Sequence, residues 1–180
     1  MRKTTSYFIF YCYNYDFILR VERFIMKILE GKIALQGNER IAVLCSRFNS
    51  MVTERLIEGA KDCYLRHGGS EDNFTLIRVP GAFELPFVLE KVLENGDYDG
   101  VCVLGAIIRG GTPHFDYVAA ESTKGIANVT LKYGGAVSFG ILTTDSIEQA
   151  LDRAGLKVGN KGFEAMASLI ELIDIYRQLD

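Results

Sequence analysis

Four apolar runs of strand length divide this chain, and a stretch with helical periodicity follows each of them. The runs cover residues 41–45, 74–79, 100–108 and 136–142. Strands that alternate with helices are typical of a parallel sheet whose two faces are both covered. The pattern therefore predicts a three-layer α/β/α sandwich with a central, mostly parallel four-stranded sheet.

The helical stretches are expected at residues 51–67, 84–93, 116–131 and 162–179. A further short helix is expected to run to Arg153, with Thr144 or Asp145 as its N-cap. A short strand at residues 32–35 is expected to add to an edge of the sheet. Since no repeat or low-complexity linker follows, residues 26–180 are predicted to form one domain.

Residues 1–25 differ in composition from the rest of the chain. They hold eight of the twenty Phe and Tyr residues, no glycine, and a net charge of +2. A basic start followed by aromatic residues suggests a signal peptide, but Asn14 and Asp16 interrupt the apolar run and no small-residue cleavage site follows. We expect either an unstructured extension or translation from an upstream start, with Met26 as the working initiator.

Charge and cysteine spacing exclude several classes of function. The net charge of −3 gives no indication of a nucleic-acid partner, and the aromatic leader is too short and polar to span a membrane. The four cysteines show no paired or CxxC spacing, so we expect neither disulfides nor zinc, and a reducing cytoplasm. His67 and His114 have no third ligand at metal spacing, so no metal is expected.

Polar, aromatic or glycine-rich segments follow all four predicted strands, at the edge where parallel sheets bind ligands. The segment after the third strand is the most informative, because Arg109-Gly-Gly-Thr112 is followed almost at once by His114. Backbone N–H groups freed by glycine, a hydroxyl and an imidazole suit a phosphorylated substrate whose reaction moves protons. The alternative is a tight turn with a solvated histidine.

Aromatic residues after the first two strands indicate a flat ligand. Phe48 is expected to stack on a heterocycle while Asn49 donates to a polyol or a ring carbonyl; alternatively, Phe48 is a hydrophobic staple for the next helix. Phe83 and Glu84 repeat the theme, although Glu84 equally suits a first-turn carboxylate favoured by the helix dipole. His67 is expected to be a favourable charge near a helix C-terminus, not a catalyst.

Several motifs extend this pattern along the chain. They are RFN (47–49), PGAFELP (80–86), IRGGTPHFDY (108–117), FGILTT (139–144) with IEQA (147–150) and RAG (153–155), and GNKG (159–162). In order and spacing they resemble the 6,7-dimethyl-8-ribityllumazine synthase family, from about Met26 to the C-terminus. The resemblance implies a flavodoxin-like fold whose short N-terminal strand, matching residues 28–35, joins the sheet of a neighbouring subunit.

The resemblance also implies a transferase reaction, the penultimate step of riboflavin synthesis, in which 5-amino-6-(D-ribitylamino)uracil condenses with 3,4-dihydroxy-2-butanone 4-phosphate. No metal or organic cofactor takes part in that family. By match of motif, His114 moves protons, and the uracil substrate is held by Phe48, Asn49, Ala82, Phe83, Glu84, Ala106, Ile107, Ile108 and, from a neighbouring subunit, Phe139. The phosphate is held by Gly111, Thr112 and Arg153, with Lys161 as a further contact nearby.

The implied partner is the chain itself. Members of the family form pentamers, and the short linker at residues 154–160 is typical of members that assemble 60 subunits into an icosahedral shell; an enclosed riboflavin synthase is left open. Asp152 departs from the glutamate common in the family.

Two other classes of function remain as alternatives. One is a non-catalytic flavin- or lumazine-binding or shell-forming homologue, which would not need His114, Thr112 and Arg153. The other is a flavodoxin-like phosphosugar or FMN binder, which would place its glycines after the first strand.

Overall fold

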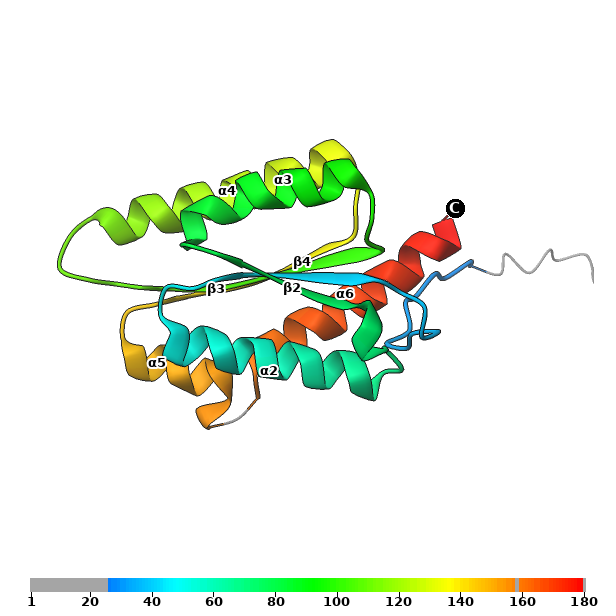
Figure 1. Ribbon diagram of the computed structural model, residues 1–180, viewed down its shortest axis with the longest axis horizontal. Coiled ribbons are helices and arrows are strands. Elements are labelled where there is room, and N and C mark those ends of the chain that lie inside the picture. The colour runs from blue at the N-terminus through cyan, green and yellow to red at the C-terminus, as the bar shows by residue number, and fades with distance from the viewer. Residues whose placement is uncertain (1–25, 158, 180) are drawn as a thin grey trace, which may run out of the picture.

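A four-stranded sheet forms the centre of the molecule (Figure 1). The computed structural model describes residues 26–157 and 159–179, so the expectation for residues 1–25 lies outside the described part. The strands are β1 (Ile41–Ser46), β2 (Phe74–Val79), β3 (Gly100–Ile108) and β4 (Val137–Thr144). Their order is β2-β1-β3-β4 and every neighbouring pair is parallel. The predicted sheet is confirmed, and it is parallel throughout.

Helices cover both faces of the sheet, which gives the predicted three layers (Figure 1). One face carries α3 (Leu85–Asn95) and α4 (His114–Tyr133); the other carries α2 (Ser50–Arg66), α5 (Ile147–Leu151) and α6 (Lys161–Leu179). Short helical turns occur at Glu71–Asn73, Ala82–Glu84 and Asp152–Leu156. Within the described residues, no helix combines the length and the apolar character needed to cross a lipid bilayer.

Alternate side chains of β1 serve the two layers in turn. Ile41, Val43 and Cys45 belong to the core under α2 and α6, whereas Ala42 and Leu44 belong to the core under α3 and α4. All of these side chains are fully buried. The strand is therefore apolar at successive positions because both of its faces are covered.

Helices α2 and α6 pack closely where glycine removes a side chain. A Cβ on Gly162 would clash with the backbone oxygen of Leu56, and a Cβ on Gly59 would clash with the side chain of Asn160. The Asn160 amide nitrogen donates to the backbone oxygen of Arg55 at 2.8 Å, and its amide oxygen accepts the Gly162 N–H at 2.8 Å. Asn160 therefore caps the start of α6 while it ties α6 to α2.

The N-cap of α5 is neither of the two predicted residues. Ser146 occupies the position, and its hydroxyl oxygen accepts the Gln149 N–H at 3.2 Å. Thr144 is the last residue of β4, which extends beyond the predicted end at residue 142. Asp145 then lies in the connection between strand and cap, so both expected caps were placed too early.

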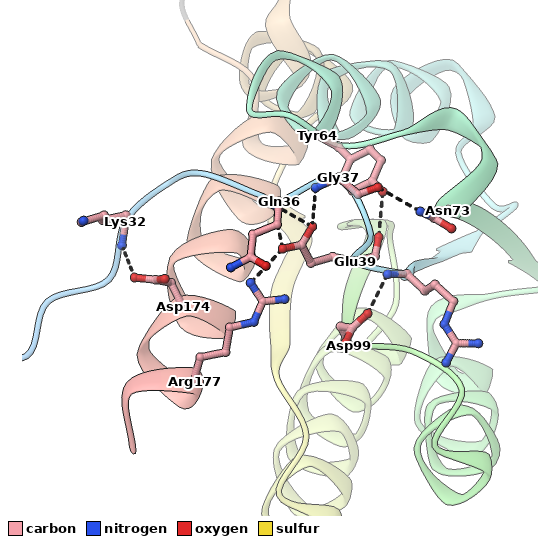
Figure 2. Close-up of polar contacts among 10 residues, drawn as sticks. Lys32, Gln36, Gly37, Glu39, Tyr64, Asn73, Asp99, Asp174 and Arg177 are labelled. Atoms are coloured by element: carbon pink, nitrogen blue, oxygen red, sulfur yellow. Dashed lines mark hydrogen bonds and ion pairs between the residues drawn. The ribbon is translucent and has the colours of Figure 1, made fainter. Parts of the chain in front are cut away.

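The predicted strand at residues 32–35 is wrong for the isolated chain, because the described residues 26–40 form no strand. This segment runs beside α6 instead (Figure 2). The Lys32 N–H donates to the Asp174 carboxylate at 2.9 Å, and the Leu35 N–H donates to the backbone oxygen of His67 at 2.8 Å. The backbone N–H groups of Lys32 and Leu35 thus donate to a side chain of α6 and to the C-terminal end of α2. The prediction had expected them to pair with an edge strand of the sheet.

Glu39 is a buried carboxylate just before β1 (Figure 2). It accepts the Gln36 N–H at 2.9 Å and a guanidinium N–H of Arg177 at 2.8 Å, and the Tyr64 hydroxyl donates to its backbone oxygen at 2.8 Å. Burial alone raises the pKa of Glu39, but the hydrogen bonds from Gln36 and Arg177 outweigh burial and hold its pKa below the ordinary 4.5.

This lowered pKa makes the stability of the fold depend on pH in acid. A carboxyl with a lower pKa in the folded chain stabilises the fold above its unfolded pKa, and the stabilisation is lost as the pH falls through the folded pKa. We therefore expect the melting temperature of the wild type to decrease when the pH is lowered below about 4.5. The Glu39→Gln variant should be less stable than the wild type at neutral pH, but its melting temperature should depend less on acid pH. Thermal unfolding followed by circular dichroism checks this, and an equal acid sensitivity of both chains would contradict it.

Candidate active site

The carboxyl ends of β1, β2 and β3 open into a cavity of about 590 Å³ beside α4. A volume of this size is usual for a small-molecule site. The predicted site residues Phe48, Asn49, Ala82, Phe83, Glu84, Ala106, Ile107, Ile108, Thr112 and His114 all line this cavity. The structure therefore brings together three of the four strand ends that the sequence pattern singled out, and the end of β4 does not line the cavity.

The loop after β1 presents an aromatic ring on a fixed backbone. Phe48 is 73% exposed. Its neighbour Asn49 has φ of 60°, the one left-handed non-glycine residue in the described part of the chain. The Asn49 side-chain amide donates to the backbone oxygen of Ala106 at 2.8 Å. This bond joins the loop to the end of β3 and so fixes the backbone beside the exposed ring of Phe48.

The turn after β2 supplies a second aromatic wall. Phe83 is 47% exposed and meets the ring of Phe87 edge-to-face, with 5.9 Å between the ring centroids. Ala82, the preceding residue, is buried, and Glu84 immediately precedes α3. Glu84 lines the cavity and occupies the N-cap position of α3, one residue before its first turn.

The segment after β3 has open space around its two glycines, Gly110 and Gly111. A Cβ on Gly110 or Gly111 would meet nothing within 4 Å. Helix α4 starts at His114, directly after Pro113, and runs for 20 residues. The N-terminus of a helix presents free N–H groups and favours an anion. The glycine loop and the start of α4 together form an exposed surface suited to a phosphate, with an imidazole beside it.

Arg109 adjoins the glycine loop and is held by two carboxylates. Its guanidinium pairs with Asp145 at 2.9 Å and with Asp116 at 3.0 Å. The hydrogen bond to Asp145 raises the pKa of Arg109, so the side chain stays a cation. Its carbon Cζ lies 4.1 Å from the ring centroid of Phe115, which lines the cavity.

Four predicted site residues do not line the cavity of their own chain. Gly111 lies between lining residues in the loop. Phe139 lies on the edge strand β4, 44% exposed, in a separate hollow beside α6. Arg153 is exposed and donates to the backbone oxygen of Gln149 at 3.2 Å, and Lys161 pairs with Glu164 in the first turn of α6. Arg153 lies in the turn Asp152–Leu156 and Lys161 begins α6, and both elements belong to the layer opposite α4 (Figure 1).

One face of α4 contributes residues that the sequence reasoning missed. Tyr117, Val118 and Glu121 line the cavity together with His114, at the i, i+3, i+4, i+7 spacing of one helix face. The predicted helix started at residue 116, two positions too late to include His114 in this periodicity. Glu121 pairs with Lys124 at 2.7 Å and also lines the cavity.

Neither a thiol nucleophile nor a metal centre is present in the described residues. Cys45, Cys63 and Cys102 are buried and free, and burial raises the pKa of Cys45 and Cys102 to about 12 and that of Cys63 to about 11. They are therefore inert thiols. The described part of the chain also has no group of three or more His, Cys, Asp or Glu side chains able to hold a metal ion.

The chain matches known proteins over most of its length. The sequence profile described as 6,7-dimethyl-8-ribityllumazine synthase matches residues 38–177. Proteins named 6,7-dimethyl-8-ribityllumazine synthase from Helicobacter hepaticus and Wolinella succinogenes are each 69% identical over 154 residues, and one from Helicobacter pylori is 67% identical over 154 residues. Each match covers 86% of this chain and 99% of the relative. With this identity across one continuous domain, the chain belongs to the 6,7-dimethyl-8-ribityllumazine synthase family.

Proposed function

We propose that the cavity, completed by a neighbouring copy of the chain, is where this enzyme makes 6,7-dimethyl-8-ribityllumazine. The reaction is the lumazine synthase step of riboflavin biosynthesis. In it, 5-amino-6-(D-ribitylamino)uracil condenses with 3,4-dihydroxy-2-butanone 4-phosphate, and phosphate and water leave. One observation carries the assignment of the site: exposed aromatic rings and an open glycine loop with His114 face the same 590 Å³ space.

The residue types suit the chemistry of this condensation. The nucleophile is the 5-amino group of the substrate, so the protein needs no reactive serine, cysteine or lysine. Its main task is to hold two substrates in attack geometry, which can lower a barrier by roughly 7–11 kcal/mol. Imine formation, loss of phosphate and ring closure each move a proton, and His114 is the imidazole at the cavity that can both give and take one.

The aromatic part of the cavity receives the uracil substrate. Phe48 stacks on the ring, and Phe83 with Glu84 borders the ribityl chain and the ring edge. The Asn49 amide nitrogen donates one of its two hydrogens to Ala106. Its second hydrogen and its side-chain oxygen remain for the ribityl chain and the ring edge. Backbone groups at residues 106–108 complete the recognition of the pyrimidine.

The glycine loop receives the phosphate of the ketone. Gly111 and Thr112 precede α4 in an exposed segment, and the positive end of the helix adds a favourable field for a dianion. No metal or organic cofactor is assigned to the reaction. We place the enzyme in the reducing cytoplasm, on the basis of the three cysteines in the described residues, which are free.

A neighbouring copy supplies the residues that the cavity lacks. Arg153 and Lys161 belong to the layer opposite α4, and Phe139 lies on the free edge of β4, so each is available to another copy's cavity. We assign Phe139 to the uracil side and Arg153 with Lys161 to the phosphate. Such head-to-tail contacts close into a ring, in agreement with the pentamer and the 60-subunit shell that we propose. Residues 28–35 pair with the neighbour's sheet in that assembly.

The direct test of function is to mix the two substrates with the purified chain. Formation of lumazine absorbance with release of one phosphate supports the proposed reaction. Binding of lumazine or flavin without phosphate release would instead identify a non-catalytic homologue. Light scattering on the same sample measures the assembly, and a monomer that turns over at full speed would contradict the shared site.

Mixed assemblies provide a prediction specific to the shared site. The Arg153→Ala variant should raise KM for the phosphorylated ketone about tenfold, since it removes a charge-assisted contact. Refolded together with an equal amount of His114→Ala, it should regain activity at low ketone, because about a quarter of the sites then combine both native residues. Turnover of the refolded mixture checks this. An activity equal to the mean of the two variants would place both residues in one chain's site.

A further inference from the structure

Arg109 lies at the junction of three segments around the cavity. Its backbone N–H follows β3 and donates to the backbone oxygen of Thr144, at the end of β4, at 2.9 Å. Its guanidinium contacts Asp145 after β4 and Asp116 in the first turn of α4. One side chain thus connects the end of β3, the β4–α5 connection and the start of α4.

The same guanidinium supports the cavity wall from outside. It lies over the ring of Phe115 at 4.1 Å, within the range of a cation–π contact. Phe115 lines the cavity, whereas Arg109 does not. Because Phe115 and Asp116 directly follow His114, Arg109 holds the turn of helix that carries the imidazole.

The glycine loop has few other contacts that could hold it. Gly110, Gly111 and Thr112 are exposed. Within the described part of the chain, no backbone–backbone hydrogen bond other than those inside helices and strands involves any of these three residues. Two glycines in succession also leave the backbone with wide conformational freedom. The shape of the loop is therefore set by the residues at its two ends.

We propose that Arg109 is the positioning residue for the phosphorylated ketone. Through Asp145 and Asp116 it fixes both ends of the glycine loop in the geometry that receives the phosphate. The inference rests on the proposed function, which places phosphate at Gly111 and Thr112. It assigns Arg109 no contact with either substrate.

Loss of Arg109 has a positional effect and a charge effect, which different variants separate. Arg109→Gln frees the loop and also leaves Asp116 and Asp145 uncompensated near a dianion. The triple variant R109Q/D116N/D145N removes the excess negative charge but does not restore the ionic contacts. Arg109→Lys keeps the cation and can contact one carboxylate, although it loses the fork geometry.

The experiment measures KM for each substrate separately in the assembled enzyme. Arg109→Gln should raise KM for the phosphorylated ketone about tenfold, equivalent to about 1.4 kcal/mol, while KM for the uracil substrate stays within about twofold. The triple variant should keep the raised KM and Arg109→Lys should recover part of it. Amide exchange over residues 109–118 should quicken in Arg109→Gln, because the loop is no longer held at both ends.

Arg78→Gln is the matched control. Arg78 is also a half-exposed arginine paired with a carboxylate, Glu54, but it lies outside the cavity lining, so its loss should leave both KM values unchanged. An unchanged ketone KM in Arg109→Gln, an equal rise in both KM values, or a return to the wild-type value in the triple variant would each overturn the inference. If the wild type made no lumazine, the proposed function would fail, while amide exchange would still report whether Arg109 holds the loop.

Discussion

Replacing Gly162 with alanine should leave most of the chain unfolded at temperatures where the wild type is stable. Alanine normally stabilises a helix by about 1 kcal/mol relative to glycine. Here the new methyl group would clash with the backbone oxygen of Leu56 in α2. A backbone atom in the middle of a helix cannot rotate away, so α6 must move off α2. Overpacking typically costs about 1–3 kcal/mol, and we expect about 3 kcal/mol or more at this contact.

Gly59→Ala is the matched comparison for that result. It adds a methyl group at the same helix contact, but the group would meet the side chain of Asn160 rather than backbone. A side chain can rotate, at the cost of the bonds that Asn160 makes to Arg55 and Gly162. We expect a smaller loss of stability in Gly59→Ala, measured for both variants by thermal unfolding. A Gly162→Ala variant as stable as the wild type would show that the helices pack less closely than described.

The His114→Ala variant should lose about a hundredfold in kcat while it still folds, assembles and binds both substrates. General acid–base catalysis typically contributes about 10²–10⁴-fold, and the lower end applies because the substrate supplies its own nucleophile. Residual turnover should remain, since holding the substrates together accounts for much of the rate. Steady-state kinetics across a range of pH measure both effects.

His67→Ala is the control for this variant. His67 lies at the C-terminal end of α2, where its ring nitrogen Nδ1 is 2.7 Å from the backbone oxygen of Cys63. Its loss should leave kcat and its pH dependence unchanged. If His114→Ala kept the full rate at every pH, the proton-transfer role would belong to another group.

The strands and the position of the site were predictable because both follow from local chemistry. A strand buried on two faces must be apolar along its length, so the bounds of β3 agree with the predicted run at residues 100–108. The ends of such strands meet at one edge, which brought Phe48, Phe83 and His114 to one cavity. The start of α4 was predicted at residue 116, two residues too late. The helix begins at His114, because Pro113 occupies its N-cap position and is not part of a longer loop.

The features that the sequence could not supply depend on interactions that spacing does not encode. The segment at residues 32–35 has the composition of a strand, but α6 offers Asp174 as a competing partner for its backbone. Arg153 and Lys161 lie in a layer chosen by the handedness and order of the whole sheet. Their distance from the cavity of their own chain therefore depends on tertiary structure, and the role that we propose for them depends on how copies of the chain meet.

The left-handed backbone of Asn49 limits how natural selection can vary the entrance to the cavity. With φ at 60°, the position favours asparagine, aspartate or glycine over other residues. Of these three, only asparagine also carries the amide that donates to Ala106. The position therefore requires both a left-handed backbone and a side-chain donor. Among the three favoured residues, only asparagine provides both.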